Sequence, residues 1–175
     1  MAATLIEWES KSALMAHLTN VGRRYVVVGA DAEAPRRFYS FGVDSSAGQG
    51  VEIGIVMSGH GIRPSWTISP DSKSLAVGHD LAVTFVDVSS RRVVAVRRLE
   101  GVFFEFVASD SPGEIIVWHE IGVAKMNFSG DKLWHVSTDI LEECRPQPNG
   151  TLVLRQQGDE DELVIDLRTG NRIRG

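Results

Sequence analysis

Short apolar runs, separated by turn-forming residues, make up most of the chain. The first of them are residues 25–28, 38–43 and 51–57, and after residue 62 the Gly, Pro, Asp, Asn and Ser residues between runs recur regularly. Runs of this length bounded by turn residues predict β-strands, and their even spacing predicts an all-β fold.

One short helix is predicted near the N-terminus. Over residues 11–18, Leu14, Met15 and Leu18 fall on one helical face, and Ser10 stands at the N-cap position. A Ser hydroxyl at that position accepts a hydrogen bond from a free backbone N–H of the first turn. The Asn-Val-Gly turn that follows ends the helix after about two turns.

The later strands belong to a repeat. Three stretches each consist of a polar turn followed by three apolar residues: 69–77, 109–117 and 146–154. Their anchors Leu75, Ile115 and Leu152 are 40 and 37 residues apart, and a second set of Asp or Asn anchors at 87, 127 and 166 is spaced by 40 and 39. Repeats of about 40 residues with four short strands each are typical of β-propeller blades.

A weaker copy precedes these repeats. Residues 5–8 are expected to form its first strand, 25–28 its second, 38–43 its third and 51–56 its fourth, with the helix as an insertion. The chain is then a single domain, 1–175, of approximate units 1–58, 59–100, 101–138 and 139–175.

Residues 59–98 resemble a WD40 repeat. Gly59-His60 opens the unit, Ser69-Pro70-Asp71 makes the turn, and Val86-Asp87 takes the Trp-Asp position; the run Gly130 to Trp134 is similar to a quinoprotein-type blade. The resemblance covers residues 59–175. It implies about four propeller-like four-stranded repeats, in a small closed ring or an open stack. A β-sandwich or barrel whose hairpins imitate repeats is the alternative.

Apolar and aromatic positions within the repeats predict the core. Rings on both faces of residues 103–106 predict a central strand, and Trp66 and Phe104 are expected to pack between blades. The predicted core residues are Val26, Val28, Ile53, Trp66, Leu75, Val77, Phe85, Phe104, Ile115, Val117, Met126, Trp134, Leu152, Leu154 and Ile165.

Composition narrows the compartment and the ligands. The 175 residues are 43% hydrophobic and carry a net charge of 18 − 23 = −5, so generic nucleic-acid binding is disfavoured. The single Cys144 cannot form an internal disulfide, Glu7 and Glu9 interrupt any signal-like start, and no apolar run is long enough to span a membrane. We therefore expect a cytoplasmic protein.

Two histidines occupy equivalent places after the second strand of successive repeats. His79-Asp80 and His119-Glu120 are candidate catalytic pairs, because a neighbouring carboxylate would raise the imidazole pKa. The alternative is a pair of ordinary polar hairpin turns, which we favour. No histidine forms a metal-binding spacing with another or with Cys144, so no metal or cofactor is expected.

Acidic residues gather near the C-terminus. Residues 139–166 hold eight acids against Arg145 and Arg155, a local balance of −6. If their loops share a face, they form a surface for a basic partner; the alternative is a solvated surface that aids solubility. The candidate partner-binding residues are Asp139, Glu142, Glu143, Asp159, Glu160, Asp161 and Glu162.

These observations favour a non-catalytic protein-binding module of the inhibitor, immunity or assembly type. One alternative is a small hydrolase or lyase that uses His79 or His119 with the neighbouring carboxylates. Another is a self-associating structural module, whose terminal sheets pair with a second copy to form a homo-oligomer.

Overall fold

Four small antiparallel-rich sheets follow one another along the chain. The computed structural model describes residues 4–32, 34–44, 50–60, 62–109, 111–159 and 161–173. Helix α1 (Lys11–Asn20) lies within the segment of the first sheet, which has the order β1-β3-β4-β2. Its strands are β1 (Ile6–Trp8), β2 (Arg24–Val28), β3 (Arg37–Val43) and β4 (Val51–Met57).

The second and third sheets have four strands each, hydrogen-bonded in chain order. The second contains β5 (Ser65–Ile68), β6 (Ser74–His79), β7 (Ala82–Asp87) and β8 (Arg92–Arg98), and the third contains β9 (Phe103–Val107), β10 (Glu114–His119), β11 (Gly122–Asn127) and β12 (Lys132–Ser137). The fourth sheet has three strands, β13 (Leu141–Gln147), β14 (Thr151–Gln156) and β15 (Glu162–Asp166).

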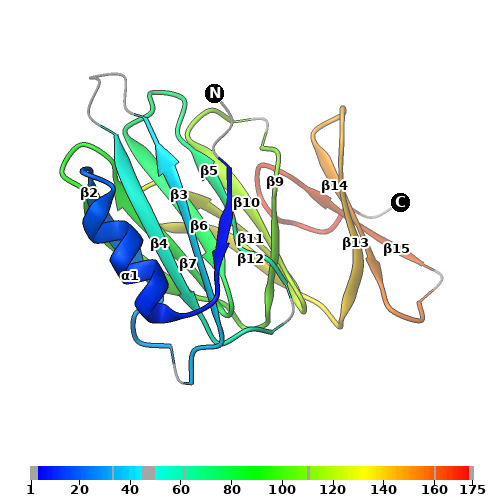
Figure 1. The fold of residues 1–175 in the computed structure, drawn as a ribbon. Coiled ribbons are helices and arrows are strands. Elements are labelled where there is room, and N and C mark those ends of the chain that lie inside the picture. The colour runs from blue at the N-terminus through cyan, green and yellow to red at the C-terminus, as the bar shows by residue number, and fades with distance from the viewer. Residues whose placement is uncertain are drawn as a thin grey trace.

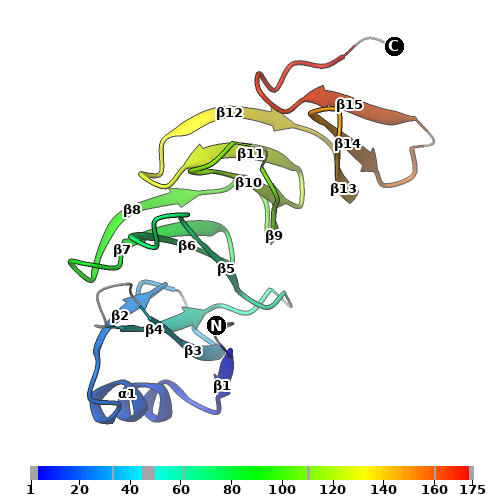
Figure 2. The same ribbon diagram turned by 90° about the horizontal axis from the view of Figure 1, so that it is seen from above.

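The sheets are arranged as the blades of an open arc (Figures 1 and 2). Strands β1, β5, β9 and β13 lie toward the concave side, and the first and fourth sheets stand at opposite ends of the arc (Figure 2). This confirms the all-β, propeller-like fold with one N-terminal helix, in its open form. Four separate sheets exclude the β-sandwich and barrel alternatives. Among the described residues, no helix has the length and apolar character needed to cross a membrane.

The predicted strand order of the first sheet is wrong. Strand β2, expected in second place, lies at the outer edge and pairs in parallel with β4, with Val26 opposite Ile53. The ten-residue helix between β1 and β2 takes the chain from one edge of the sheet to the other, and β3 then lies in the connection between the parallel strands β2 and β4. An apolar run predicts a strand but does not name its neighbour.

The repeat extends to details of the second and third sheets. The pairing of β7 with β8 shifts register between Phe85 and Val86, and that of β11 with β12 shifts between Lys125 and Met126, forty residues later. Each shift is a β-bulge on an outer strand, which twists an exposed edge away from unwanted pairing. The bulges leave Val94 54% and Leu133 47% exposed.

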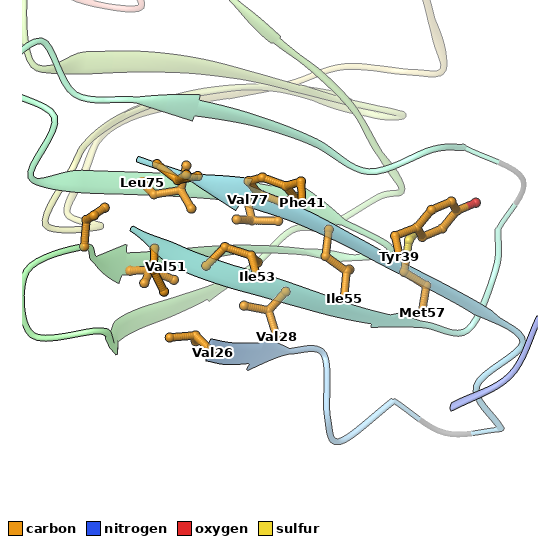
Figure 3. Packing of buried hydrophobic residues seen from close by; sticks show 13 residues of the cluster. Val26, Val28, Tyr39, Phe41, Val51, Ile53, Ile55, Met57, Leu75 and Val77 are labelled. Atoms are coloured by element: carbon orange, nitrogen blue, oxygen red, sulfur yellow. The ribbon is translucent and has the colours of Figure 1, made fainter. Parts of the chain in front are cut away.

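Apolar side chains fill the spaces between neighbouring sheets. Figure 3 shows the first such layer, in which Phe41 and Ile53 of the first sheet lie beside Val77 of the second. Trp66 stacks on Phe41 with ring centroids 4.0 Å apart, as expected for an inter-blade aromatic. Three of the predicted core residues, all aromatic, are only half-buried: Trp66, Phe104 and Trp134. The other predicted core residues are buried.

Strand β9 is an edge strand, contrary to the central position predicted for residues 103–106. It nevertheless contacts β5 and β6 on one side and β13 on the other. Phe103 and Phe106 pack together in the cluster shared with the second sheet, whereas Phe104 contacts Trp118, which packs against the cluster shared with the fourth sheet; Glu105 stays exposed. Aromatic rings on both faces of this strand therefore indicate that a neighbouring sheet packs on each face, and do not indicate that the strand is central within its own sheet.

Candidate functional site

Asp80 connects three sheets through hydrogen bonds. It occupies the two-residue turn between β6 and β7 with a positive φ of 43°. Its carboxylate accepts hydrogen bonds from the backbone N–H groups of Ser58 (2.8 Å) and Gly59 (3.2 Å). Its backbone carbonyl accepts one from Phe103 N–H at 2.8 Å. The carboxylate thus binds backbone and not the adjacent imidazole.

His79 lies under this turn and is only 5% exposed. Its Nε2 is 3.0 Å from Thr84 Oγ1, and its Nδ1 has no hydrogen-bond partner. The backbone of Gly29 packs on the ring: a Cβ there would lie 3.3 Å from His79 Cε1. Burial lowers the pKa of His79, against the opposing charges of Asp80 and Asp31. The rise in pKa expected for this pair is wrong, because loss of solvation outweighs the carboxylates.

A pocket of about 950 Å³ opens above His79, between the first and second sheets. Val28, Gly29 and Asp31 line one wall, and Val96 and Arg98 of β8 line the other. Volumes of ~300–1,000 Å³ are typical of small-molecule sites.

His119 belongs to a different group. Its Nε2 is 3.3 Å from His135 Nε2, and His135 Nδ1 lies 3.7 Å from Glu100 Oε1. Burial, followed by the charge of His135, lowers the pKa of His119 to about 4. Glu120 takes no part: its Oε2 accepts a hydrogen bond from Val102 N–H at 3.4 Å.

The two predicted catalytic pairs therefore occupy equivalent hairpin ends, His79 opposite Ala82 and His119 opposite Gly122. Neither imidazole is hydrogen-bonded to the carboxylate of the residue that follows it in the sequence. Within the described ranges, no group of three or more His, Cys, Asp or Glu side chains is placed to hold a metal ion.

The acidic candidates separate into two sets. Glu142, Glu143 and Glu162 lie on the fourth sheet beside Arg145 and Arg155. Arg145 Nε is 3.1 Å from Glu143 Oε1 and its Nη2 is 3.0 Å from Glu162 Oε1. Arg155 Nη2 is 3.5 Å from Glu143 Oε2, and its Nε is 3.8 Å from Glu142 Oε2. This set forms a network of ion pairs on one face of the sheet.

The second set lies in loops at one end of the fourth sheet, and we call it the acidic loop cluster: Asp139, Asp159 and Asp161. Gln156 connects its members, because its Oε1 accepts from Asp139 N–H (3.0 Å), its Nε2 donates to Asp159 Oδ2 (3.3 Å), and Asp161 N–H donates to Asp159 Oδ1 (3.2 Å). Glu160 lies outside the described residues.

Ile140 stands within the acidic loop cluster and is 46% exposed. Its carbonyl accepts a hydrogen bond from Gln157 N–H at 2.8 Å, which holds it against the loop that carries Asp159. No Arg or Lys of the described chain lies within ion-pair distance of Asp139, Asp159 or Asp161.

Sequence reasoning missed Lys125, a buried cation between the third and fourth sheets. It is 2% exposed, and its Nζ lies 2.6 Å from Glu114 Oε2 and donates to Leu167 O at 3.1 Å. Trp134 Nε1 donates to the same carbonyl at 3.1 Å. The available signal was the repeat itself, since Lys125 takes the position that Phe85 holds forty residues earlier.

Comparisons with known proteins support the fold. No family model and no curated protein sequence matches the chain. Among solved structures, Kuenenia stuttgartiensis hydrazine synthase is similar over 87% of this chain and 48% of its own, with a TM-score of 0.55 and 16% identity. The dihydro-heme d1 dehydrogenase NirN in complex with DHE is similar over 78% of this chain and 33% of its own, with a TM-score of 0.50 and 13% identity.

Both are propeller-type proteins, and the chain spans less than half the length of either. At these identities the similarity shows the fold alone: the chain forms propeller-like blades.

Proposed function

We propose that the protein is a non-catalytic protein-binding module that recognises a basic partner through the acidic loop cluster. The observation that carries this proposal is the exposed Ile140, which follows Asp139 in the chain and is held by its carbonyl against the loop that carries Asp159 and Asp161. An apolar anchor surrounded by charges of one sign has the composition of a protein-binding surface.

The two acidic sets differ in the charge they offer a partner. Glu142, Glu143 and Glu162 are offset by Arg145 and Arg155, so much of their field is cancelled locally. The Asp159 carboxylate accepts from the Gln156 amide and from Asp161 N–H, neutral donors that leave its charge in place. Unpaired charges on a rim steer an oppositely charged partner and make its binding dependent on salt.

Rigid support strengthens the proposal. The loops that carry the cluster connect strands of two packed sheets, and backbone hydrogen bonds from Thr138 to Ile121 O and from Leu141 to Glu120 O hold the connection in place. Loops fixed on a rigid scaffold lose little entropy on binding. An inhibitor and an assembly protein would both use such a surface.

The test compares two variants of equal charge change. In the loop variant, Asp139, Asp159 and Asp161 become Asn; in the face variant, Glu142, Glu143 and Glu162 become Gln. Each is immobilised beside the unmodified protein and exposed to native cell extract at about 50 mM and about 300 mM salt. We expect a basic protein that the unmodified protein and the face variant retain at low salt and that the loop variant loses.

The binary affinity of the captured protein is then measured with each variant and with Ile140→Ser. An equal loss of the captured protein by the loop and face variants would show that net charge alone drives capture, and full retention by the loop variant would show that the loops are not needed; either result would overturn the proposal. Retention that survives both high salt and Ile140→Ser would place the interface elsewhere on the molecule.

A further inference from the structure

We propose that the pocket between the first and second sheets binds a small apolar zwitterion, of the class of a short apolar peptide with free termini. The pocket is separate from the acidic loop cluster, so this inference does not depend on the proposed function.

The bulge in β8 gives the pocket one apolar wall. Opposite residues of paired strands lie on the same sheet face, and the pairs Val93–Val86, Val96–Thr84 and Arg98–Ala82 all belong to the face turned toward the first sheet. The bulge at Val94 is what brings Val93 into phase with Val96.

The exposure of this wall indicates that it lacks a partner among the described residues. Val93 is 42% and Val96 53% exposed although both line the pocket. The facing wall comes from the end of β2 and the residues after it, including Val28 and Ala30. An apolar body placed between the walls would remove both valines from water, which is favourable in proportion to the area covered.

Opposite charges stand on the two walls. Asp31 comes from the segment after β2, and Arg98 from the end of β8. Neither lies within ion-pair distance of an oppositely charged group in the described part of the chain, and they are not paired with each other. The carboxylate of Asp80 is already bound by Ser58 and Gly59 N–H, and burial keeps the His79 imidazole neutral.

These features define the ligand. A cation alone would leave Arg98 unpaired, and an anion alone would leave Asp31 unpaired. A molecule with an ammonium group for Asp31, a carboxylate for Arg98 and an apolar body between them satisfies both walls. A single amino acid is small for about 950 Å³, whereas a peptide of a few residues suits a pocket of that size.

The probe is leucyl-alanyl-leucine, titrated by calorimetry and by amide chemical shifts, beside its N-acetylated and C-amidated forms. We expect one site per chain, with shifts confined to β8 and the segment after β2. Removal of either terminal charge should weaken binding about fivefold to tenfold, because each replaces a charge-assisted contact.

Variants assign each terminus to its wall. In Arg98→Gln, the free tripeptide and its amide should bind within about twofold of each other, while the preference for a free ammonium persists. In Asp31→Asn, the pattern should reverse. Val96→Asp should abolish binding, whereas Val94→Asp should leave it intact, since Val94 is equally exposed (54% against 53%) but does not line the pocket.

Arg92→Gln controls for charge, because Arg92 is exposed on the same strand and lies outside the pocket. All the substituted side chains are exposed, and circular dichroism checks the fold of each variant. No saturable binding of the tripeptide below about 1 mM, or equal loss in Val94→Asp and Val96→Asp, would overturn the assignment. Equal binding of the free and blocked peptides would overturn the zwitterion in favour of a purely apolar ligand.

Discussion

The two ends of the arc solve the same problem with different chemistry. A stack of sheets leaves a bare face at each end, and an apolar bare face would promote association. At the N-terminal end, α1 covers the first sheet with Leu14 and Leu18, which are 0% and 1% exposed. At the C-terminal end, the outer face of the fourth sheet carries charged side chains instead.

Cross-strand register explains the second solution. Leu152, Leu154 and Ile165 point toward the third sheet, so residues of opposite parity form the outer face. One row of that face is Arg145, Val153 and Val164, and the next is Glu143, Arg155 and Glu162. The Arg stems cover Val153, which is 8% exposed, while their guanidinium groups pair with the carboxylates. The helix covers one end with buried apolar side chains, and charged side chains keep the other end polar. The two ends should therefore contribute differently to the free energy of unfolding.

The largest expected effect is at the helical end. Leu18→Ala removes a buried side chain whose Cδ1 lies close to Gly54, where even a Cβ would approach it to 2.6 Å. The tight contact leaves little room for relaxation, so the free energy of unfolding should fall by about 3–5 kcal/mol. Urea denaturation measures it.

Ser12→Ala is the control for this prediction, because Ser12 is exposed on the same helix. It should change the free energy of unfolding by less than about 0.5 kcal/mol. A loss below ~1 kcal/mol for Leu18→Ala would show that the helix does not close this end.

A smaller effect should follow a change of pH. His119 titrates near 4 in the folded protein, below its ordinary value of 6.5, because burial disfavours the imidazolium. The unfolded chain therefore binds the proton more readily, and stability declines as the pH falls from about 6.5 to about 4. The decline due to His119 should total about 3 kcal/mol.

His119→Phe tests the source of this slope. The variant should show a flatter pH dependence of unfolding between about 6.5 and 4 than the unmodified protein, with carboxylate effects common to both. Amide exchange should lose protection in β10 and β11 before α1, since the apolar packing of the helix does not titrate. An unchanged slope would mean that His119 is not the group responsible.

The repeat made much of this architecture predictable from sequence. Spaced anchors such as Leu75 and Ile115 predict strands, blades and core. Ser10 predicts the start of the helix, and its hydroxyl accepts a hydrogen bond from Ala13 N–H. These signals are local, or recur at a fixed period, so one sequence suffices to see them.

Features that depend on the choice of a distant neighbour were not predictable. The apolar run of β2 gives no sign that it will cross the sheet and pair in parallel with β4. The count of acids near the C-terminus does not show that Glu143 and Glu162 pair with Arg145, while Asp139 and Asp159 are both hydrogen-bonded to Gln156. Composition gives a charge, whereas register decides which charges cancel.

The smallest effect belongs to the charged end. Arg155 and Glu143 are each more than a third exposed in their side chains, at 47% and 36%, so water and salt screen their attraction. Arg155→Ala should lower the free energy of unfolding by less than about 1 kcal/mol. Its larger consequence concerns solubility, because loss of the guanidinium leaves Glu142 and Glu143 less balanced on the outer face. Equilibrium unfolding gives the first quantity, and concentration-dependent light scattering gives the second. A loss above about 2 kcal/mol would mean that the ion pairs of the fourth sheet stabilise the fold as strongly as the helix does, instead of only keeping the outer face polar.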